Sequence, residues 1–280
     1  MSGSLIVVAT PIGNLGDLSP RALAALTTSD VVCCEDTRHT RKLFSANSVA
    51  TSRLLALHEH NEKNMIVEIL RRLDEGQTVA LVTDAGTPGV SDPGPLVIAA
   101  VIEAGFRVTT VPGPTAAIAA LTVSGLKMDR FCIEGFWPRR AADLDERIEL
   151  LLVEPRTTVF YESPKRIGAT LARMAVRLGE RRAAVARELT KLHEDVVRGT
   201  VSELANYFDG RDVLGEITVV VEGAVLNTDV DDDTIFRELR HNLARGMSVR
   251  DSASLVASTL GVSKRRTYEI ALAISRELDS

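Results

Sequence analysis

The chain has 280 residues, of which 45% are hydrophobic and 25% charged, and its formal net charge is −5. This length exceeds the usual size of one domain, so we expect two domains or one domain with an appendage. The acidic balance and the low aromatic content argue against a protein that binds single strands by base stacking, although a local basic face can still bind nucleic acid.

The cysteines and the apolar runs indicate the compartment. Three cysteines, with Cys33 next to Cys34, cannot form a disulfide framework and suit a reducing compartment, so we expect the cytoplasm. The first residues carry no signal-like pattern, and no apolar run reaches the roughly 18 residues of a membrane span. His58 and His60 alternate, but no third ligand follows at a recognisable spacing, so no metal site is predicted.

The first part of the chain alternates between short apolar runs and helical periodicity. Ser19-Pro20 predicts a helix start, and Gly76 and Gly105 stand where helices should end. The runs are apolar throughout, which is typical of strands in a parallel sheet covered on both faces. We therefore predict an α/β domain over 1–114, with strands at 5–9, 31–34, 79–83 and 108–111 and clear helices at 64–75 and 96–104.

The pattern changes after Pro112-Gly113-Pro114. A second α/β domain is predicted over 115–225, and the run at 195–198, following the one at 183–185, indicates an antiparallel element. The remaining expected strands lie at 131–133, 157–161, 183–186 and 217–221, and the helices at 115–124, 143–152 and 164–178.

The C-terminal part is read as an acidic linker over 226–233 and a helical unit over 234–280. Helices expected at 234–244, 249–259 and 264–278 have the spacing of a helix-turn-helix. The last one opens with Lys264-Arg265-Arg266, which can meet phosphates, but an appendage that contacts only protein fits equally well.

Three loops rich in glycine and proline follow predicted strands, at 10–17, 81–95 and 111–116. Ligands of open α/β sheets bind at the carboxyl ends of the strands, so these loops predict one crevice, in which Asp84 and Asp92 can accept hydrogen bonds from ribose hydroxyls or an amine. The alternative is a set of stiff structural turns. Neither G-x-x-x-x-G-K-[ST] nor a helix-opening G-x-G-x-x-G is present, which weakens ATP, GTP and NAD as ligands.

Six motifs occur in order: residues 9–17 (ATPIGNLGD), 35–38 (EDTR), 84–94, 112–114 (PGP), 160–166 (FYESPKR) and 187–194 (RELTKLHE). Together they resemble the tetrapyrrole methylase superfamily and, more narrowly, the ribosomal RNA small subunit methyltransferase I family. The resemblance implies two α/β domains with an S-adenosylmethionine cleft between them, a homodimer, and methylation of a cytidine 2'-hydroxyl in the 16S ribosomal RNA of the small subunit.

The resemblance also implies site residues. The cofactor would be held by Pro11, Asp84, Ala85, Gly86, Val90, Ser91, Asp92, Thr115 and Ala116 in the first domain, and by Tyr161, Leu189, Gly215, Glu216 and Ile217 in the part that completes the cleft. For each residue of the second group, a packing role is an equal alternative.

Basic residues beside these motifs suit contact with RNA phosphates. They are Arg38, Arg41, Lys42, Arg139, Arg140, Lys165 and Arg166, to which the tail adds Arg265 and Arg266. A solvated surface is the alternative for each.

Methyl transfer to a hydroxyl needs alignment of the reactants and a group that takes the proton. Glu35 and Asp36 are the first candidates, followed by Lys191 and His193; the acidic pair could instead position Arg38 and Arg41. Two rival functions stay open, namely a small-molecule, tetrapyrrole-like methylase and a non-catalytic RNA- or ribosome-binding protein.

Overall fold

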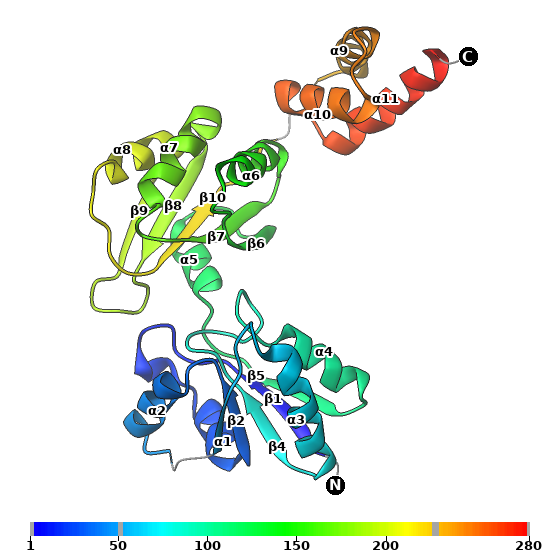
Figure 1. Cartoon of the computed structure of the whole chain (residues 1–280). Coiled ribbons are helices and arrows are strands. Elements are labelled where there is room, and N and C mark those ends of the chain that lie inside the picture. Colours follow the sequence, from blue (N-terminus) through cyan, green and yellow to red (C-terminus); the bar gives the residue numbers. More distant parts are fainter. Residues whose placement is uncertain (1–2, 50–52, 226–229, 279–280) are drawn as a thin grey trace. The chain divides into compact units, whose positions relative to one another are not determined.

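The structure is a computed structural model that describes residues 3–49, 53–225 and 230–278 (Figure 1). The chain forms two compact units, one of Met1–Ala120 with Arg187–Asp195 and the other of Leu121–Ala186 with Val196–Ser280. The boundary at 120 falls inside helix α5 (Ala116–Ser124). After the second unit has begun, the segment 187–195 therefore returns to the first unit.

The first unit is built on a parallel sheet with the strand order β3-β2-β4-β1-β5. Each neighbouring pair in this order runs parallel; Ser4, for example, is opposite Thr78 on one side and Arg107 on the other. The predicted parallel sheet is confirmed. Its strands are β1 (Ser4–Val8), β2 (Val31–Cys34), β3 (Arg53–Ala56), β4 (Thr78–Leu81) and β5 (Arg107–Val111).

Helices cover both faces of this sheet. Leu81 on one face packs in a cluster with Leu73 of α3 (Glu62–Asp74) and Val97 of α4 (Pro95–Glu103). Val32 on the other face packs with Leu26 of α1 (Pro20–Thr28) and Phe44 of α2 (Thr37–Ala46). Successive strand residues point to opposite faces, so a strand covered on both sides is apolar at every position.

The helix ends in this unit follow the predicted signals. The Ser19 hydroxyl accepts a hydrogen bond from the Ala22 N–H at 3.1 Å, and Pro20 is the first residue of α1. Gly76 and Gly105 follow α3 and α4 with φ of +79° and +80°, the left-handed conformation that ends helices.

Among the α-helices and strands of the first unit, α2 and β3 were not predicted, nor was the short 3-10 helix η1 (Leu15–Asp17). Helix α2 buries Thr40, Leu43 and Phe44, which is helical spacing, within an otherwise polar sequence. Strand β3 is a four-residue edge strand without a fully buried residue. Helix α2 has no continuous apolar run. Strand β3 does contain one, Leu54-Leu55-Ala56, which was overlooked.

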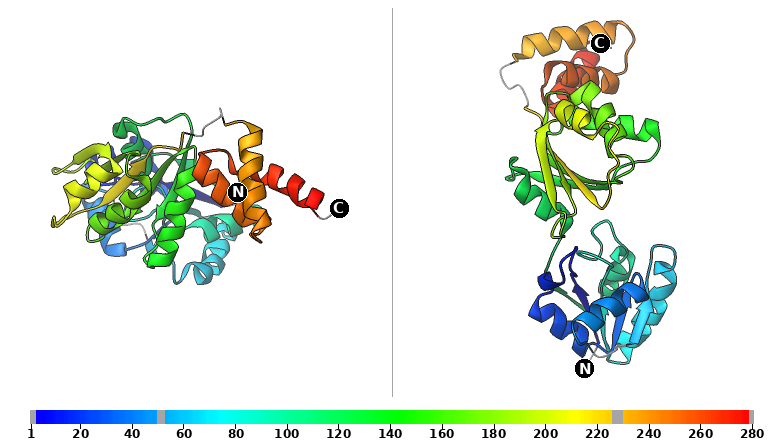
Figure 2. Two further views of the ribbon diagram at one scale, coloured as in Figure 1. Left: turned by 90° about the horizontal axis from the view of Figure 1, so that it is seen from above. Right: turned by 90° about the vertical axis from the view of Figure 1, so that its left-hand side faces the viewer.

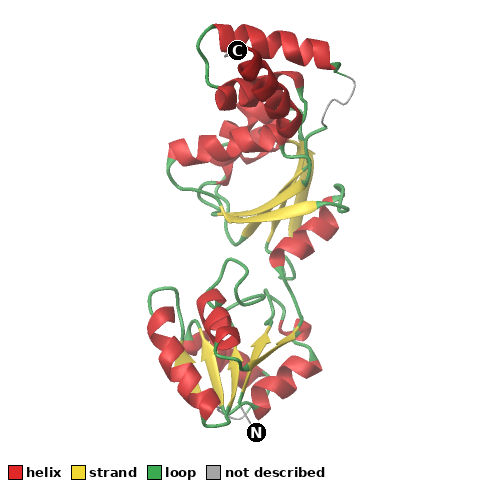
Figure 3. Ribbon diagram, turned by 90° about the vertical axis from the view of Figure 1, so that its right-hand side faces the viewer, coloured by secondary structure: helices red, strands yellow, loops and turns green. Residues whose placement is uncertain are grey.

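The second unit contains a mixed sheet with the order β6-β7-β10-β8-β9 (Figure 3). Strand β6 runs parallel to β7 with an irregularity between Ile133 and Phe136, and β10 runs antiparallel to β7. The winding is therefore mixed, and not purely β-α-β. The two runs predicted to form the antiparallel element, at 183–185 and 195–198, lie in the neighbouring strands β8 and β9. The strands are β6 (Phe131–Phe136), β7 (Thr157–Glu162), β8 (Arg182–Arg187), β9 (Asp195–Thr200) and β10 (Ile217–Val221).

Three helices pack with this sheet: α6 (Ala141–Val153), α7 (Ile167–Leu178) and α8 (Val201–Phe208). Trp137 stacks on Phe160 in the core, with ring centroids 3.7 Å apart. Helix α8 was not predicted, although Thr200 and Glu203 form a capping box at its start.

The C-terminal helices α9 (Asp232–Ala244), α10 (Val249–Leu260) and α11 (Lys264–Leu278) share a small core that includes Leu239, Val256 and Ile274 (Figure 2). Helix α9 begins two residues before the expected start, because the carboxylate of Asp231 caps it by accepting from the Thr234 N–H at 2.6 Å. Residues 226–229 of the predicted linker lie outside the described residues.

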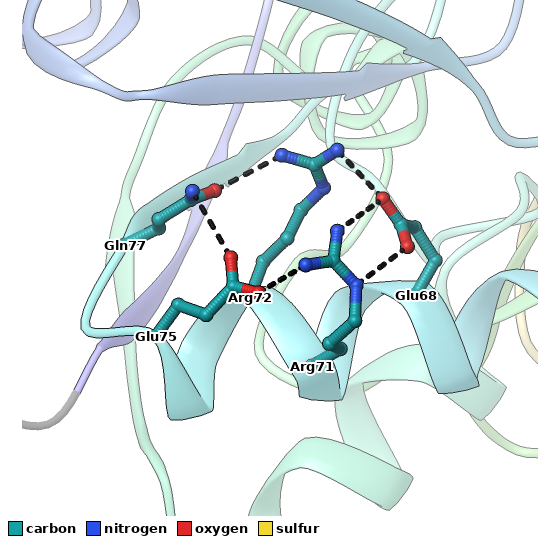
Figure 4. Close-up of polar contacts among 5 residues, drawn as sticks. All are labelled: Glu68, Arg71, Arg72, Glu75 and Gln77. Atoms are coloured by element: carbon teal, nitrogen blue, oxygen red, sulfur yellow. Dashed lines mark hydrogen bonds and ion pairs between the residues drawn. The ribbon is translucent and has the colours of Figure 1, made fainter.

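A buried arginine fixes the end of α3 (Figure 4). Arg72 is 2% exposed; its guanidinium lies 2.6 Å from a Glu68 carboxylate oxygen and donates to the Gln77 side-chain oxygen at 3.0 Å. Arg71, which is half exposed, pairs with Glu68 and Glu75.

Over the ranges that the structure describes, no helix combines the length and apolar character needed to cross a membrane. The same ranges contain no group of three or more histidine, cysteine or acidic residues placed to hold a metal ion.

Candidate active site

Three loops of the first unit leave the carboxyl ends of the adjacent strands β4, β1 and β5, and hydrogen bonds connect them. Thr10 and Gly86 exchange two backbone hydrogen bonds of 2.8 and 3.1 Å. The Thr87 hydroxyl donates to the Pro114 carbonyl at 3.1 Å and lies 2.8 Å from the Thr115 hydroxyl. The three predicted loops therefore form one connected surface within this unit.

The loop from β4 to α4 depends on unusual backbone angles. Gly86 has φ of +84° and Gly94 has φ of +133°; a Cβ on Gly94 would lie 3.1 Å from a Leu81 methyl carbon. Ser91 adopts φ of +66° without being glycine. Such angles are held only where the surrounding contacts fix them, so the loop has a defined shape.

Carboxylates gather where β2 and β4 end. The backbone N–H of Asp36 donates to the Asp84 carboxylate at 3.0 Å, and Glu35 accepts from the backbone N–H of Asp84. Burial, with the nearby charge of Glu35, raises the pKa of Asp92 to about 6. Burial also raises the pKa of Glu35, to which the charge of Asp84 adds. These shifts mark a site that would favour a positively charged ligand.

Asp36 is already engaged in holding α2. Its carboxylate accepts from the Arg38 backbone N–H at 2.7 Å and forms an ion pair of 2.7 Å with the Arg38 guanidinium. These hydrogen bonds hold the pKa of Asp36 well below its usual range. The Arg38 side chain is 83% exposed, and Arg41 and Lys42 are exposed on the same helix.

A further carboxylate, that of Glu62, was not identified from the sequence. Glu62 is 5% exposed, and one of its oxygens accepts the backbone N–H groups of Gly94, Leu96 and Val97 at 3.1, 2.8 and 3.2 Å. A helix N-terminus at this edge of a parallel sheet is the usual place for a ligand phosphate. Here the protein's own carboxylate fills it, in agreement with the missing nucleotide-binding motifs.

The segment 187–195 belongs to the first unit and contacts the loop that follows β1. A Cβ on Gly13 would lie 2.9 Å from both Lys191 Cε and the Thr190 hydroxyl oxygen. Lys191 forms an ion pair of 2.8 Å with Glu188, and both Glu188 and Thr190 have positive φ. The predicted residues Leu189 and Lys191 are thus held in a strained turn against Gly13, whereas His193 is exposed.

The remaining predicted cofactor residues lie in the second unit and form a separate group. Tyr161 is opposite Thr218 in the β7/β10 pair, so it lies near Ile217, and Gly215 has φ of +94° just before that strand. Glu216 lies between Gly215 and Ile217 in the sequence. The structure thus brings Tyr161 and 215–217 together on one sheet.

The predicted basic residues of the second unit differ in their availability. Arg139, Arg140 and Lys165 are exposed. Arg166 forms an ion pair of 3.3 Å with the buried Glu162 and donates to the carbonyl oxygens of Trp137 and Pro138, so it holds the segment after β6.

In the C-terminal helices, Arg265 is 86% exposed, whereas Arg266 is bound within the bundle. Its guanidinium lies 2.7 Å from an Asp232 carboxylate oxygen and donates to the Val230 carbonyl at 2.9 Å.

Comparison with protein families gives one match that covers most of the chain. The model described as Tetrapyrrole (Corrin/Porphyrin) Methylases matches residues 4–205. Two similar curated proteins are both named ribosomal RNA small subunit methyltransferase I. The one from Mycobacterium tuberculosis (strain CDC 1551) is 44% identical over 279 residues, or 99% of this chain and 97% of that protein. The one from Xylella fastidiosa (strain Temecula1) is 45% identical over 269 residues, or 95% and 98%.

Solved structures share the fold at lower identity. Uroporphyrin-III C-methyltransferase from Thermus thermophilus, complexed with S-adenyl homocysteine, matches with a TM-score of 0.55 and 18% identity over 78% of this chain and 96% of that chain. A conserved hypothetical protein from Aeropyrum pernix K1 matches with a TM-score of 0.62 and 18% identity over 99% and 98%.

Proposed function

Because the chain belongs to the tetrapyrrole methylase family and, within it, to the ribosomal RNA small subunit methyltransferase I family, we propose that it methylates a cytidine ribose 2'-hydroxyl in 16S ribosomal RNA. S-adenosylmethionine is the methyl donor.

The observation that carries the assignment within the structure is the charge around the three connected loops. Glu62 occupies the α4 N-terminus, so a ligand phosphate finds no free helix end there. Asp84, Asp92 and Glu35 add negative charge at the same sheet edge. A sulfonium-bearing ligand without phosphates suits these surroundings, and a nucleotide does not.

In the reaction, the ribose oxygen forms a bond to the methyl carbon while the carbon–sulfur bond breaks. The sulfur keeps the electron pair and becomes neutral, and the hydroxyl loses its proton. The chain's own contribution is alignment, for which the fixed loop conformations are suited.

Among the proposed proton acceptors, Glu35 fits best. A general base works best when its pKa is close to the operating pH, and burial raises the pKa of Glu35 towards that range. Asp36 is the weaker base, since Arg38 holds its carboxylate ionised. Lys191 is bound to Glu188, which fits a role in shaping the site.

On the RNA side, the exposed Arg38, Arg41 and Lys42 of α2 follow the acidic pair directly in the sequence. We assign them to phosphate contact, together with Arg139, Arg140 and Lys165. Arg166 takes an internal role instead, because its side chain is only 27% exposed and binds the buried Glu162 and two carbonyl oxygens. Arg38 is also paired, with Asp36, but its side chain is 83% exposed.

A homodimer is part of the proposal. Strand β6 ends the order of the second sheet, and its Phe131, Ile133 and Phe136 are 39%, 36% and 70% exposed. An apolar edge strand can pair with the same strand of a second copy. Light scattering on wild type and on Phe136→Asp tests this, with the variant expected to shift towards monomer.

The proposed substrate, 16S ribosomal RNA, implies that the protein acts in the cytoplasm.

The deciding experiment is methyl transfer from labelled S-adenosylmethionine to small ribosomal subunits that lack the modification, followed by mapping of the labelled nucleotide and its ribose. Label on a cytidine 2'-hydroxyl supports the proposal. Cofactor binding without label on any form of the subunit would overturn it in favour of a small-molecule methylase or a binding protein.

A further inference from the structure

One face of α9 carries exposed basic residues that the proposed site does not use. Arg237, Arg240 and Arg245 are all exposed, and His241 lies among them. At about 100° per residue, Arg237 lies opposite the buried Ile235 and Leu239. Arg240 and Arg245, the C-cap residue of α9, lie to either side of Arg237. The three arginines, here called the stripe, cover the solvent side of the helix over a length of about 12 Å, at a rise of 1.5 Å per residue.

Most other arginines of the second unit form an ion pair. Arg237, Arg240 and Arg245 form none with the residues that the structure describes. Arg173 and Arg177 of α7, in contrast, bind Asp145 and Glu149. The acidic residues on the exposed side of α9, Asp233 and Glu238, do not pair with the stripe. After the hydrogen bonds from Thr234, the charge of Arg237 also lowers the pKa of Asp231. No carboxylate of the described residues forms an ion pair with the three guanidinium groups, which are therefore available to an external anion.

The bundle holds this face outward. The Arg266–Asp232 ion pair connects α11 to the first turn of α9, and Ile235 and Leu239 pack in the core that α9 shares with α10 and α11. The stripe is thus a fixed feature of a folded surface.

We propose that the stripe Arg237, Arg240 and Arg245 binds the phosphate backbone of the ribosomal RNA substrate, outside the methyl-transfer site. The inference rests on the proposed function. It gives the C-terminal bundle an RNA contact on α9, whereas the sequence points either to a phosphate contact at the start of α11 or to an appendage that contacts only protein. Over residues 230–276, eight lysine and arginine residues stand against six acidic residues, whereas the chain as a whole is acidic. Arginine suits phosphate because its guanidinium binds two oxygens at once.

RNA fits this surface better than a membrane. Phe236 and Leu243 beside the arginines pack against the bundle core, and Met247 after them is only 36% exposed. An amphipathic helix that lies on a lipid surface needs a continuous apolar face to insert. On α9 the apolar face is already buried in the bundle core.

The test uses the full chain with Arg237, Arg240 and Arg245 replaced together by Gln, which keeps helix propensity. We expect the Kd for small subunits to rise by about tenfold or more, and the dependence of log Kd on log salt to become shallower by about two to three, as three phosphate contacts are lost. The Kd for S-adenosylmethionine should not change.

Two variants serve as controls. Arg173→Gln with Arg177→Gln removes exposed but paired arginines and should bind subunits like wild type, and Arg265→Gln tests the start of α11. Circular dichroism and thermal unfolding establish that each variant is folded.

Three results would overturn the inference: wild-type affinity and salt dependence in the triple variant, loss of affinity only in Arg265→Gln, or weaker binding to intact subunits with unchanged binding to protein-free 16S RNA, which would make the partner a ribosomal protein. If wild type itself neither binds nor methylates subunits, the proposed function fails first, so the two failures are distinguishable.

Discussion

The carboxylate of Glu62 lies 3.1 Å from the backbone N–H of Gly94, 32 residues further along the chain. This contact connects the start of α3 to the end of the Asp84–Gly94 loop and joins two further hydrogen bonds from α4. One buried side chain therefore fixes both the loop and the helix after it.

We expect Glu62→Gln to reduce the stability of the fold by about 1–3 kcal/mol, because the three N–H groups lose a charged acceptor in a buried position. The KM for S-adenosylmethionine should rise while kcat changes little. Denaturant unfolding and initial rates measure the two effects, and the exposed Glu59→Gln is the matched control. A variant with wild-type stability and KM would show that the loop does not depend on this contact.

The pKa of Asp92 predicts a pH dependence of cofactor binding. Since that pKa is raised from 3.8 to about 6 in the folded state, Asp92 favours folding most at pH below 3.8, and this contribution is lost as pH rises to about 6. A bound sulfonium would favour the ionised carboxylate. The affinity for S-adenosylmethionine should therefore increase as pH rises through 6. The affinity for S-adenosylhomocysteine, whose sulfur carries no charge, should increase less.

Calorimetry with both ligands from pH 5 to about 8, around this pKa, is the measurement. Asp92→Asn should remove the difference between the two profiles. Parallel profiles in wild type would place the sulfonium away from Asp92.

Gly13 is predicted to tolerate no side chain, because a Cβ there would meet Lys191 and the Thr190 hydroxyl. Gly13→Ala should displace the 187–195 segment and lower kcat/KM by about tenfold or more, the scale of losing roughly 1.4 kcal/mol in the transition state. Gly16→Ala, in the same loop, meets only Asn14 at 3.2 Å and should keep most of the activity. Equal activities of the two variants would contradict this prediction.

The arginine pair in α3 allows a comparison on one helix. Arg72→Ala should lower stability by about 2 kcal/mol or more, since it removes a long buried side chain and leaves a cavity. Arg71→Ala removes a half-exposed partner of the same Glu68 and should change the midpoint of unfolding far less. Similar midpoints for both variants would show that burial of Arg72 adds nothing to stability.

The central strands and the three loops of the first unit could be predicted from the sequence because their signals are local. A buried parallel strand is apolar at each position, as in Val31–Cys34, and glycine and proline mark the loop that follows. Edge strand β3 carries the same kind of signal, the run Leu54-Leu55-Ala56, which was overlooked. Helix α8 did carry a local signal, the Thr200–Glu203 capping box.

Site residues could be predicted only where they belong to a motif of consecutive residues in the sequence. The connection of Thr10 with Gly86 follows from parallel strands that lie side by side, so the loops could be expected to meet. Glu62 could not be found this way, since nothing near it in the sequence indicates a partner at Gly94. The internal role of Arg166 likewise depends on carbonyl groups about 28 residues away.

The return of 187–195 to the first unit also affects the order in which the protein can fold during synthesis. Domains generally fold as the chain emerges from the ribosome, the N-terminal part first. Here the first 120 residues emerge without the segment that covers Gly13, and that segment becomes available only after the first strands of the second sheet have been made. A nascent chain stalled near residue 120 would therefore carry the sheet without the segment that lies against Gly13. Methyl-donor binding should not begin before residue 195 has left the exit tunnel.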